Sequence, residues 1–367
     1  MQYTPEELSL IWLQYTPAAS WKNINRMLQE FGSAEAVFKQ FGPDMQKSIG
    51  NDGFRDLSRL REKGLDALEA DLNAAGAYAV TESSDLYPER LRHIDTPPKL
   101  LFVKGNLPDP DKHAVAVIGA RHDTRYGRSQ AFKIAKKLAA EGVVIVSGLA
   151  RGIDTAAHRG ALEGGGITIG VLGNGIKKVY PPENKDLAEE IIRQGGAVIS
   201  EYAPDSEPLG FHFPIRNRII SGLSDAVLLI EAQKKSGTAS TVNHALDQGK
   251  DVFALPGNVD APGSELPLCL LKEGAQLCTD ADDIMDYMHW RRHPEQVSFL
   301  SADPENRQDE AADPDDPVLR ALRLEEKTFE ELLAETGFTV EDLSMRITLL
   351  ELSGKIERRG GRSYALI

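Results

Sequence analysis

The chain has 367 residues, of which 41% are hydrophobic and 27% charged, an ordinary balance for a globular protein of two or three domains. Its formal net charge of −14 excludes a general binder of polyanions, so any nucleic-acid site must be a local basic patch. The two cysteines, Cys269 and Cys278, lack metal-ligand spacing and suit a reducing compartment. Because the start lacks the features of a signal peptide and no stretch approaches a membrane span, we expect a cytoplasmic protein. We expect neither a metal nor a cofactor.

Residues 1–80 are predicted to form a small helical module, similar to a SAM or helix-hairpin-helix domain. Thr4 is placed to cap a helix with Pro5 at its first position, and Ser33 is placed to start another. Apolar residues of the first helix recur at helical spacing, at Leu8, Ile11, Trp12 and Tyr15. The segment 16–20 lacks the Gly-x-Gly turn of a helix-hairpin-helix that binds duplex phosphate, so a packing role is favoured.

Residues 81–106 are predicted to be a connector with one extended run from Leu100 to Val103, followed by an α/β domain over residues 107–290. In this domain short apolar runs alternate with segments long enough for crossover helices. The runs are 115–118, 143–146, 167–172, 197–200, 226–230, 252–255 and 275–277. Nearly continuous apolar strands are typical of a parallel sheet buried on both faces. The pattern predicts an extended Rossmann-like, doubly wound parallel sheet.

The last part of the chain is predicted to be a linker, residues 291–316, and a small domain, residues 317–367. The segment 303–316 holds seven acidic residues against one basic residue, which predicts disorder. Three helices are expected at 318–325, 329–336 and 340–353, followed by a hairpin around Gly360 and Gly361. This order is typical of a winged helix. Its third helix carries Glu341, Asp342 and Glu351, so a protein contact is favoured over reading of a DNA groove.

The loops at the carboxyl ends of the predicted strands are rich in glycine and arginine, and ligands of a doubly wound sheet bind at these ends. Small residues let backbone N–H groups approach phosphate oxygens, while arginine adds bidentate charge. The candidate contact residues are Gly119, Arg121, Tyr126, Ser147, Gly148, Lys178, Tyr180, Arg216, Asn217, Arg218, Ser236, Gly237 and Thr238. Without a full Gly-x-Gly-x-x-Gly or a P-loop, this rim suits a polyphosphate strand better than one nucleotide.

The segment Arg216-Asn217-Arg218 is the strongest anion signal. Pro214 is placed to open a helix, which puts both arginines in its first turn. The helix dipole disfavours cations there, so two arginines at this position favour a phosphate ligand. The structural alternative is an ion pair with Asp225 or Glu231.

The histidines and serines form no evident catalytic or metal-binding set. His158 is expected to cap or pack, and His212, between two phenylalanines, is expected in the core. Several aromatic residues near the rim could stack on unpaired bases, and Tyr180, before two prolines, is the best exposed of them. These are Tyr126, Tyr180, Phe211 and Phe213.

Five segments of the α/β region resemble the DprA/Smf family of DNA-processing proteins. They are VIGARHDTRYG (117–127), SGLARGIDTAAHRGAL (147–162), GVLGNGIKKVYPPEN (170–184), FHFPIRNRIISGLSDAVLLIEA (211–232) and VFALPG (252–257). Their order and spacing span most of the predicted sheet domain, and the three-part layout of the chain is similar as well. Two segments depart from the family pattern, SGTASTV at 236–242 and SELPL at 264–268. Both are expected at the far wall of the site, so this wall is expected to differ from that of the family.

The resemblance implies a protein without enzymatic activity that binds single-stranded DNA without sequence preference in a basic pocket. It further implies a homodimer formed by the sheet domain. The protein would protect DNA during uptake in natural transformation and load RecA recombinase onto strands covered by single-strand DNA-binding protein. Carried over to this chain, Arg121, Lys178, Arg216 and Arg218 hold phosphates, together with the N–H groups of the loop glycines Gly119, Gly148 and Gly237.

Two alternatives have other functions. A nucleotide phosphoribohydrolase of the lysine-decarboxylase-like group shares the sheet, but its catalytic glutamate would fall at Thr241, which cannot serve as a carboxylate base. Other nearby acids are Glu231 and Asp247, of which Glu231 is expected to orient an arginine. A transcription factor that uses the terminal domain is disfavoured because the third helix of that domain is acidic.

Overall fold

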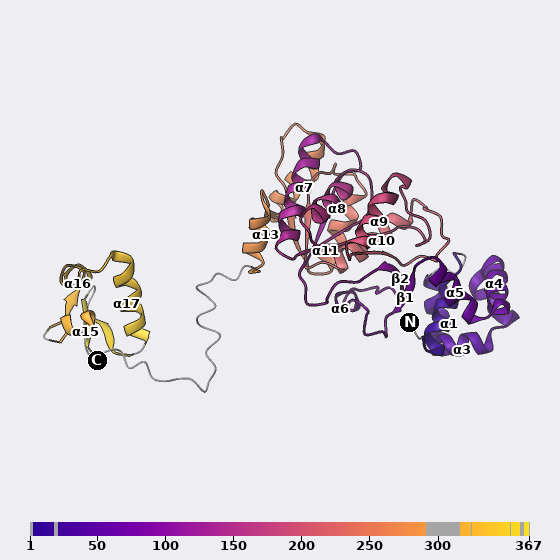
Figure 1. Cartoon of the computed structure of the whole chain (residues 1–367), viewed down its shortest axis with the longest axis horizontal. Coiled ribbons are helices and arrows are strands. Elements are labelled where there is room, and N and C mark those ends of the chain that lie inside the picture. Colours follow the sequence, from indigo (N-terminus) through magenta and orange to yellow (C-terminus); the bar gives the residue numbers. More distant parts are fainter. Residues whose placement is uncertain are drawn as a thin grey trace. The chain divides into compact units, whose positions relative to one another are not determined.

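A computed structural model describes residues 3–17, 21–290, 316–323, 325–352, 354–359 and 363–366 of the chain. These fall into two compact units, Met1–Arg291 and Arg292–Ile367, which are described separately (Figure 1). Residues 291–315 of the predicted linker and the predicted hairpin turn at 360–361 lie outside the described residues.

The first unit is built on a nine-stranded sheet with the order β1-β2-β6-β5-β4-β3-β7-β8-β9. The strands β3 to β9 are parallel to one another, whereas β2 runs antiparallel to both β1 and β6. The bounds are β1 Tyr78–Thr81, β2 Leu100–Gly105, β3 Ala114–Ile118, β4 Val144–Ser147, β5 Thr168–Val171, β6 Ala197–Ser200, β7 Ala226–Leu229, β8 Asp251–Ala254 and β9 Gln276–Leu277. The predicted α/β fold and its seven apolar strands are confirmed.

The two antiparallel strands come from outside the predicted sheet domain. β2 contains the extended run of the connector, and β1 lies at the end of the predicted helical module, after its last helix α5 (Leu65–Ala74). Lys104 of β2 pairs with Val198 of β6, so the connector extends the parallel sheet beyond β6. The sequence shows no sign of this pairing, because hydrogen bonds between strands far apart in the chain are set by the assembled sheet.

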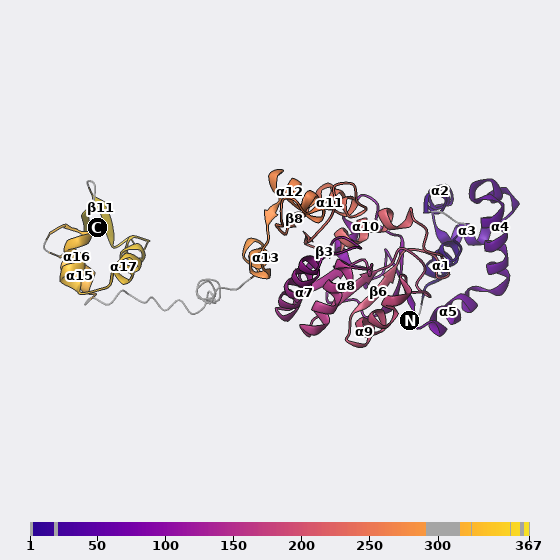
Figure 2. The ribbon, with the colours of Figure 1, turned by 90° about the horizontal axis from the view of Figure 1, so that it is seen from above.

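Helices cover both faces of the sheet, as Figure 2 shows. One face packs against α7 (Arg125–Ala140), α8 (Ile153–Glu163) and α13 (Ala281–Tyr287), and the other against α10 (His212–Gly222), α11 (Thr238–Asp247) and α12 (Glu265–Lys272). From β3 the chain winds outward through β4, β5 and β6, and then returns to β7 on the opposite side of β3. This reversal of strand order leaves a crevice at the carboxyl ends of the strands. The remaining elements of this region are α6 (Glu89–Arg92), α9 (Lys185–Arg193) and the 3-10 helices η2 (Pro182–Asn184) and η3 (Pro262–Ser264).

The N-terminal module consists of α1 (Pro5–Gln14), α2 (Trp21–Phe31), α3 (Ala34–Gln40), the 3-10 helix η1 (Pro43–Met45), α4 (Gln46–Lys63) and α5 (Leu65–Ala74). Thr4 caps α1 in a reciprocal capping box with Glu7, as its sequence predicts. Trp12 is fully buried, and its indole N–H donates a 2.9 Å hydrogen bond to the carbonyl of Leu57. The module shares one apolar core with Phe102 of β2, so it is packed onto the sheet rather than tethered to it.

The second unit has α15 (Pro317–Ala321), α16 (Phe329–Thr336) and α17 (Val340–Leu352), with β10 (Lys327–Thr328), β11 (Ile356–Arg359) and β12 (Ser363–Leu366). The strands form a sheet with the order β10-β12-β11, in which β10 is an addition to the predicted hairpin. Gly337 ends α16 in the left-handed conformation, with φ of 70°. On α17, the partly exposed Arg346 is paired with the buried carboxylate of Asp316, which neutralises its charge.

The helices α7 and α8 pack closely at Gly160. A Cβ atom at this position would lie 2.3 Å from the carbonyl oxygen of Phe132 on α7. No side chain can rotate away to relieve this contact, because the obstructing atom belongs to the backbone of a helix. This packing fixes the ends of the two helices next to the loops that follow β3 and β4.

Replacing Gly160 by alanine should therefore destabilise the first unit. Overpacking of this kind costs roughly 1–3 kcal/mol, and the backbone contact offsets the better helix propensity of alanine. The free energy of unfolding in urea measures the change. Gly210→Ala is the matched control, because a Cβ atom at Gly210 meets nothing within 4 Å. Equal stability of the two variants would contradict the packing argument.

Candidate nucleic-acid interface

A cavity of about 870 Å³ lies at the carboxyl ends of the parallel strands, where the strand order reverses. The loop after β3 and the first turns of α10 and α11 form its walls. We call this cavity the strand-end pocket. The predicted contact residues that line it are Gly119, Arg121, Tyr180, Arg216, Asn217, Ser236, Gly237 and Thr238.

Arg216 reaches from α10 into the base of this pocket and is 4% exposed. Its guanidinium donates hydrogen bonds to the carbonyl oxygens of Gly148, at 2.9 Å, and of Val171 at the end of β5. Burial lowers the pKa of Arg216 to about 10, and the nearby carboxylate of Asp154 opposes the shift. Arg216 therefore remains a cation near neutral pH. A buried cation held mainly by carbonyl groups makes the pocket attractive to anions.

Two arginines and an aromatic ring meet on one wall of the pocket. The guanidinium carbons of Arg121 and Arg216 lie 5.0 and 5.9 Å from the centre of the Phe213 ring. The Tyr180 ring is 5.8 Å from the same phenylalanine. Arg121 is exposed, and among the residues that the structure describes no carboxylate pairs with it. This wall thus offers both an available positive charge and aromatic surface.

The N-terminus of α11 forms another part of the pocket wall. Asn217 on α10 donates hydrogen bonds to the carbonyl of Gly237, at 3.2 Å, and to the hydroxyl of Ser240, at 2.8 Å, which fixes this end of α11 against α10. The hydroxyl of Thr238 donates to the carbonyl of Gly119 at 3.1 Å. The Ser236 hydroxyl is buried and has no hydrogen-bond partner within the described part of the chain. A helix N-terminus with an unused hydroxyl beside it is suited to a phosphate oxygen.

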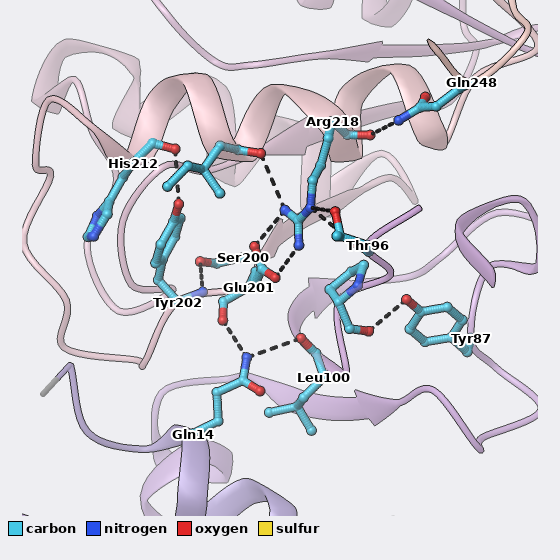
Figure 3. Close-up of polar contacts among 12 residues, drawn as sticks. Gln14, Tyr87, Thr96, Leu100, Ser200, Glu201, Tyr202, His212, Arg218 and Gln248 are labelled. Carbon is cyan, nitrogen blue, oxygen red and sulfur yellow. Dashed lines mark hydrogen bonds and ion pairs between the residues drawn. The ribbon is translucent and has the colours of Figure 1, made fainter. Parts of the chain in front are cut away.

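The placement of Arg218 at this rim requires correction. The helix α10 begins at His212, two residues before Pro214, and successive residues of a helix point about 100° apart. Arg218 therefore faces away from the strand-end pocket. Its guanidinium forms an ion pair with Glu201, with one contact at 2.7 Å, and donates to the carbonyl of Thr96 at 3.0 Å (Figure 3).

The Arg218–Glu201 pair anchors α10 to the neighbouring elements. Glu201 follows β6, and its carbonyl accepts a 2.6 Å hydrogen bond from Gln14 at the end of α1. The carbonyl of Arg218 accepts a 3.0 Å hydrogen bond from Gln248, which follows α11 (Figure 3). Burial lowers the pKa of Arg218, but Glu201 outweighs this effect, and the pKa is raised overall. The arginine thus has a structural partner, although neither of the predicted partners, Asp225 and Glu231, supplies it.

Four other predicted residues also lie outside the pocket lining. Ser147 is fully buried and donates to the carbonyl of Val117 at 2.7 Å. The N–H of Gly148 donates to Asp154 at 3.1 Å, so it is already occupied. Tyr126 donates to the carbonyl of Pro256 at 2.9 Å, and Lys178 is paired with Glu207 on the surface. The first two residues therefore shape the loops, while the last two lie beside the pocket.

The glycine at position 119 has a packing reason as well as a binding one. A Cβ atom there would lie 2.6 Å from the side chain of Ile153, the first residue of α8. Glycine thus lets α8 pack against the end of β3. Its occurrence in the loop does not by itself indicate a phosphate contact.

Two carboxylates line the pocket, of which the sequence analysis singled out Glu231 but not Asp154. Asp154 is buried in the first turn of α8 and accepts hydrogen bonds from the N–H groups of Gly148 and Ala150. Burial raises its pKa, whereas Arg216 acts in the opposite direction. Glu231 accepts a 2.9 Å hydrogen bond from the N–H of Thr124 and so caps α7 rather than orienting an arginine. The sequence could have indicated Asp154, because it is an acidic residue in the first turn of a helix that follows a glycine-rich loop.

The pocket lacks the carboxylate that the hydrolase alternative needs. Thr241 lies buried on α11 and lines the pocket, at the position where that alternative places its glutamate. Asp154 and Glu231 are both engaged with backbone N–H groups of loops and helix ends.

In the described ranges, no group of three or more His, Cys, Asp or Glu side chains could hold a metal ion. None of the helices in these ranges is both long and apolar enough to cross a bilayer.

The fold and site define a class of protein: a Rossmann-like sheet with a cationic pocket at its switch point, joined to a separate winged-helix unit. This chain belongs to the DNA recombination-mediator protein A family, whose model matches residues 78–289. The DprA winged helix domain matches residues 302–362.

Individual relatives cover most of the chain. Protein Smf of Escherichia coli K12 is 40% identical over 284 residues, which are 76% of this chain and 75% of that protein. The X-ray structure of DprA from Streptococcus pneumoniae is 35% identical, with a TM-score of 0.60, and covers 78% of this chain and 98% of that chain. DNA processing protein A from Helicobacter pylori, solved to explain its single-stranded DNA binding mode, is 31% identical, with a TM-score of 0.52 over 59% of this chain and 97% of that chain.

Replacing Arg218 by alanine should destabilise the protein, because it leaves the carboxylate of Glu201 buried without its partner. Breaking a buried pair on one side costs about 3–5 kcal/mol. The companion is the double variant Arg218→Met/Glu201→Leu, which removes both charges and should recover most of the loss. The free energy of unfolding of the three proteins measures this. A single variant as stable as the parent would show that the pair does not anchor α10.

Proposed function

We propose that this chain binds single-stranded DNA without sequence preference in the strand-end pocket. The observation that carries the proposal is that exposed Arg121 and buried Arg216 both lie against the ring of Phe213 in this pocket. The arginines attract the phosphate backbone, and the aromatic surface of Tyr180 and Phe213 suits unpaired bases. The reported single-stranded DNA binding of the Helicobacter pylori protein supports the proposal.

A single strand fits this site better than a duplex for a geometric reason. The aromatic groups lie within the hollow at the strand ends, and in a duplex the faces of the bases are covered by their stacked neighbours. The chain as a whole is strongly acidic, with a net charge of −14, so binding of phosphate requires local concentrations of positive charge such as this pocket. We infer that affinity depends on a strand that can enter the pocket.

We further propose a role as a mediator rather than an enzyme. Acting in the cytoplasm as a homodimer of the sheet domain, the protein would protect incoming single strands during natural transformation. It would also help to load RecA recombinase where single-strand DNA-binding protein covers the DNA. The family assignment supports this role, and the sequence similarity to relatives named DNA processing protein DprA agrees with it. The acidic α17, with Arg346 already paired to Asp316, favours a protein contact for the winged helix.

Single-stranded DNA should bind more tightly than duplex DNA of the same length and sequence. The log of the affinity should fall with the log of salt concentration, with a slope of about −0.7 for each phosphate neutralised on a single strand. Fluorescence anisotropy with oligonucleotides of several base compositions measures both quantities. Equal affinity for the duplex, or affinity independent of salt, would argue against the proposal.

Arg121→Ala should weaken single-strand binding without lowering stability. A hydrogen bond to a charged group contributes roughly 1.5–3 kcal/mol, so the affinity should fall at least about tenfold. The side chain is exposed and pairs with no described carboxylate, so the thermal transition should stay where it is. Lys133→Ala, an exposed cation on α7 outside the pocket, is the control with the same change of charge. Equal losses in the two variants would mean that only the overall charge matters.

A further inference from the structure

A second hollow lies between α7 and α8, on the outside of the sheet. It has a volume of about 640 Å³ and is lined mainly by the first halves of these two helices. Four arginines line it, Arg125, Arg128, Arg151 and Arg159, against one acid, Glu183. We call it the α7–α8 groove. It is a concentrated positive surface on an acidic protein.

Two of the four arginines in the groove are already neutralised. Arg128 forms a 2.7 Å ion pair with Asp123, and Arg151 is paired with Glu183. Arg125 and Arg159 are exposed, and no carboxylate pairs with either of them within the described part of the chain. Their charges are therefore available to a ligand.

The position of Arg125 is unfavourable for folding. It is the first residue of α7, directly after the N-cap Thr124, and no acid stands in this first turn. A cation at this end opposes the helix dipole. The dipole of α7 therefore does not favour Arg125 at this position, which agrees with a ligand of opposite charge.

The groove continues from the strand-end pocket. Thr124 and Ala150 line the pocket, while the next residues in the chain, Arg125 and Arg151, line the groove. Arg151 also lies within electrostatic reach of Tyr180 on the pocket wall. The loops after β3 and β4 thus form one surface with the pocket on one side and the groove on the other.

We propose that a single strand leaving the strand-end pocket continues over Arg151 into the α7–α8 groove, where Arg125 and Arg159 bind its next phosphates. The proposal rests on the proposed function, because it extends the path of the same strand. It distinguishes two lengths of ligand: a short strand fills the pocket alone, and a longer strand also engages the groove.

The test compares strands of about 6 and about 30 nucleotides of oligo-dT, within and beyond the size of a single site. The variant is Arg125→Ala/Arg159→Ala in the full chain. Affinity for the long strand should fall about fivefold, and its salt slope should become shallower by about 1.4, the value for two lost phosphate contacts. Affinity for the short strand should change less than about twofold, since the pocket is intact.

Two further variants make the result decisive. Arg125→Lys/Arg159→Lys keeps the charges and should retain most of the long-strand affinity. Lys133→Ala/Arg193→Ala changes the net charge equally at exposed sites outside pocket and groove, and should have little effect. An unchanged long-strand affinity, an equal loss for both lengths, or the same loss in this control would overturn the proposal. If the parent bound neither length, the proposed function itself would fail.

Discussion

The strand-end pocket depends on a cation buried at its base. Arg216 is almost fully enclosed, and its hydrogen-bond partners include the carbonyl oxygens of Gly148 and Val171 at the ends of neighbouring strands. A buried charge is costly unless it is well satisfied, so the strand ends and α10 must hold a fixed geometry around it. The nearby carboxylate of Asp154 offsets part of the charge. What remains is a preorganised positive site that an anion can reach from the pocket.

Three consecutive residues hold α10 in a fixed position. Arg216 points to the strand ends, Asn217 to the start of α11, and Arg218 to Glu201 after β6. Because each residue of a helix turns by about 100°, these side chains hold α10 from three sides at once. The contact of Gln14 with the carbonyl of Glu201 links the helical module to the same anchor. The module therefore supports the site although none of its described residues lines the pocket.

The two positive surfaces differ in construction, and this difference suits different tasks. In the strand-end pocket, Arg216 is buried and surrounded by backbone groups, and aromatic rings lie beside it. In the α7–α8 groove, Arg125 and Arg159 are exposed on helix surfaces. An exposed contact is weak and depends strongly on salt, whereas a preorganised contact is stronger. A DNA strand that occupied both surfaces would be bound strongly in the strand-end pocket and weakly in the α7–α8 groove.

The sequence alone determined the parallel part of the sheet and the loops at its strand ends. Runs of apolar residues marked the parallel strands because both faces of such a sheet are buried, and the glycine and arginine residues marked their carboxyl ends. Local caps were equally predictable: Thr4, Ser33 and Gly337 act within one turn of their own helices. Each of these features depends on neighbours in the sequence.

Only the tertiary structure decided which of two arginines faces the pocket. Arg216 and Arg218 are two residues apart in one helix, and their sequence context is almost the same. The start of α10 at His212 and the position of Glu201, which follows another strand, send Arg218 away from the strand ends. The same holds for Ser147, whose hydroxyl donates to the carbonyl of Val117 on a neighbouring strand. Direction and partner are properties of the assembled fold, since they depend on groups that are distant in the chain.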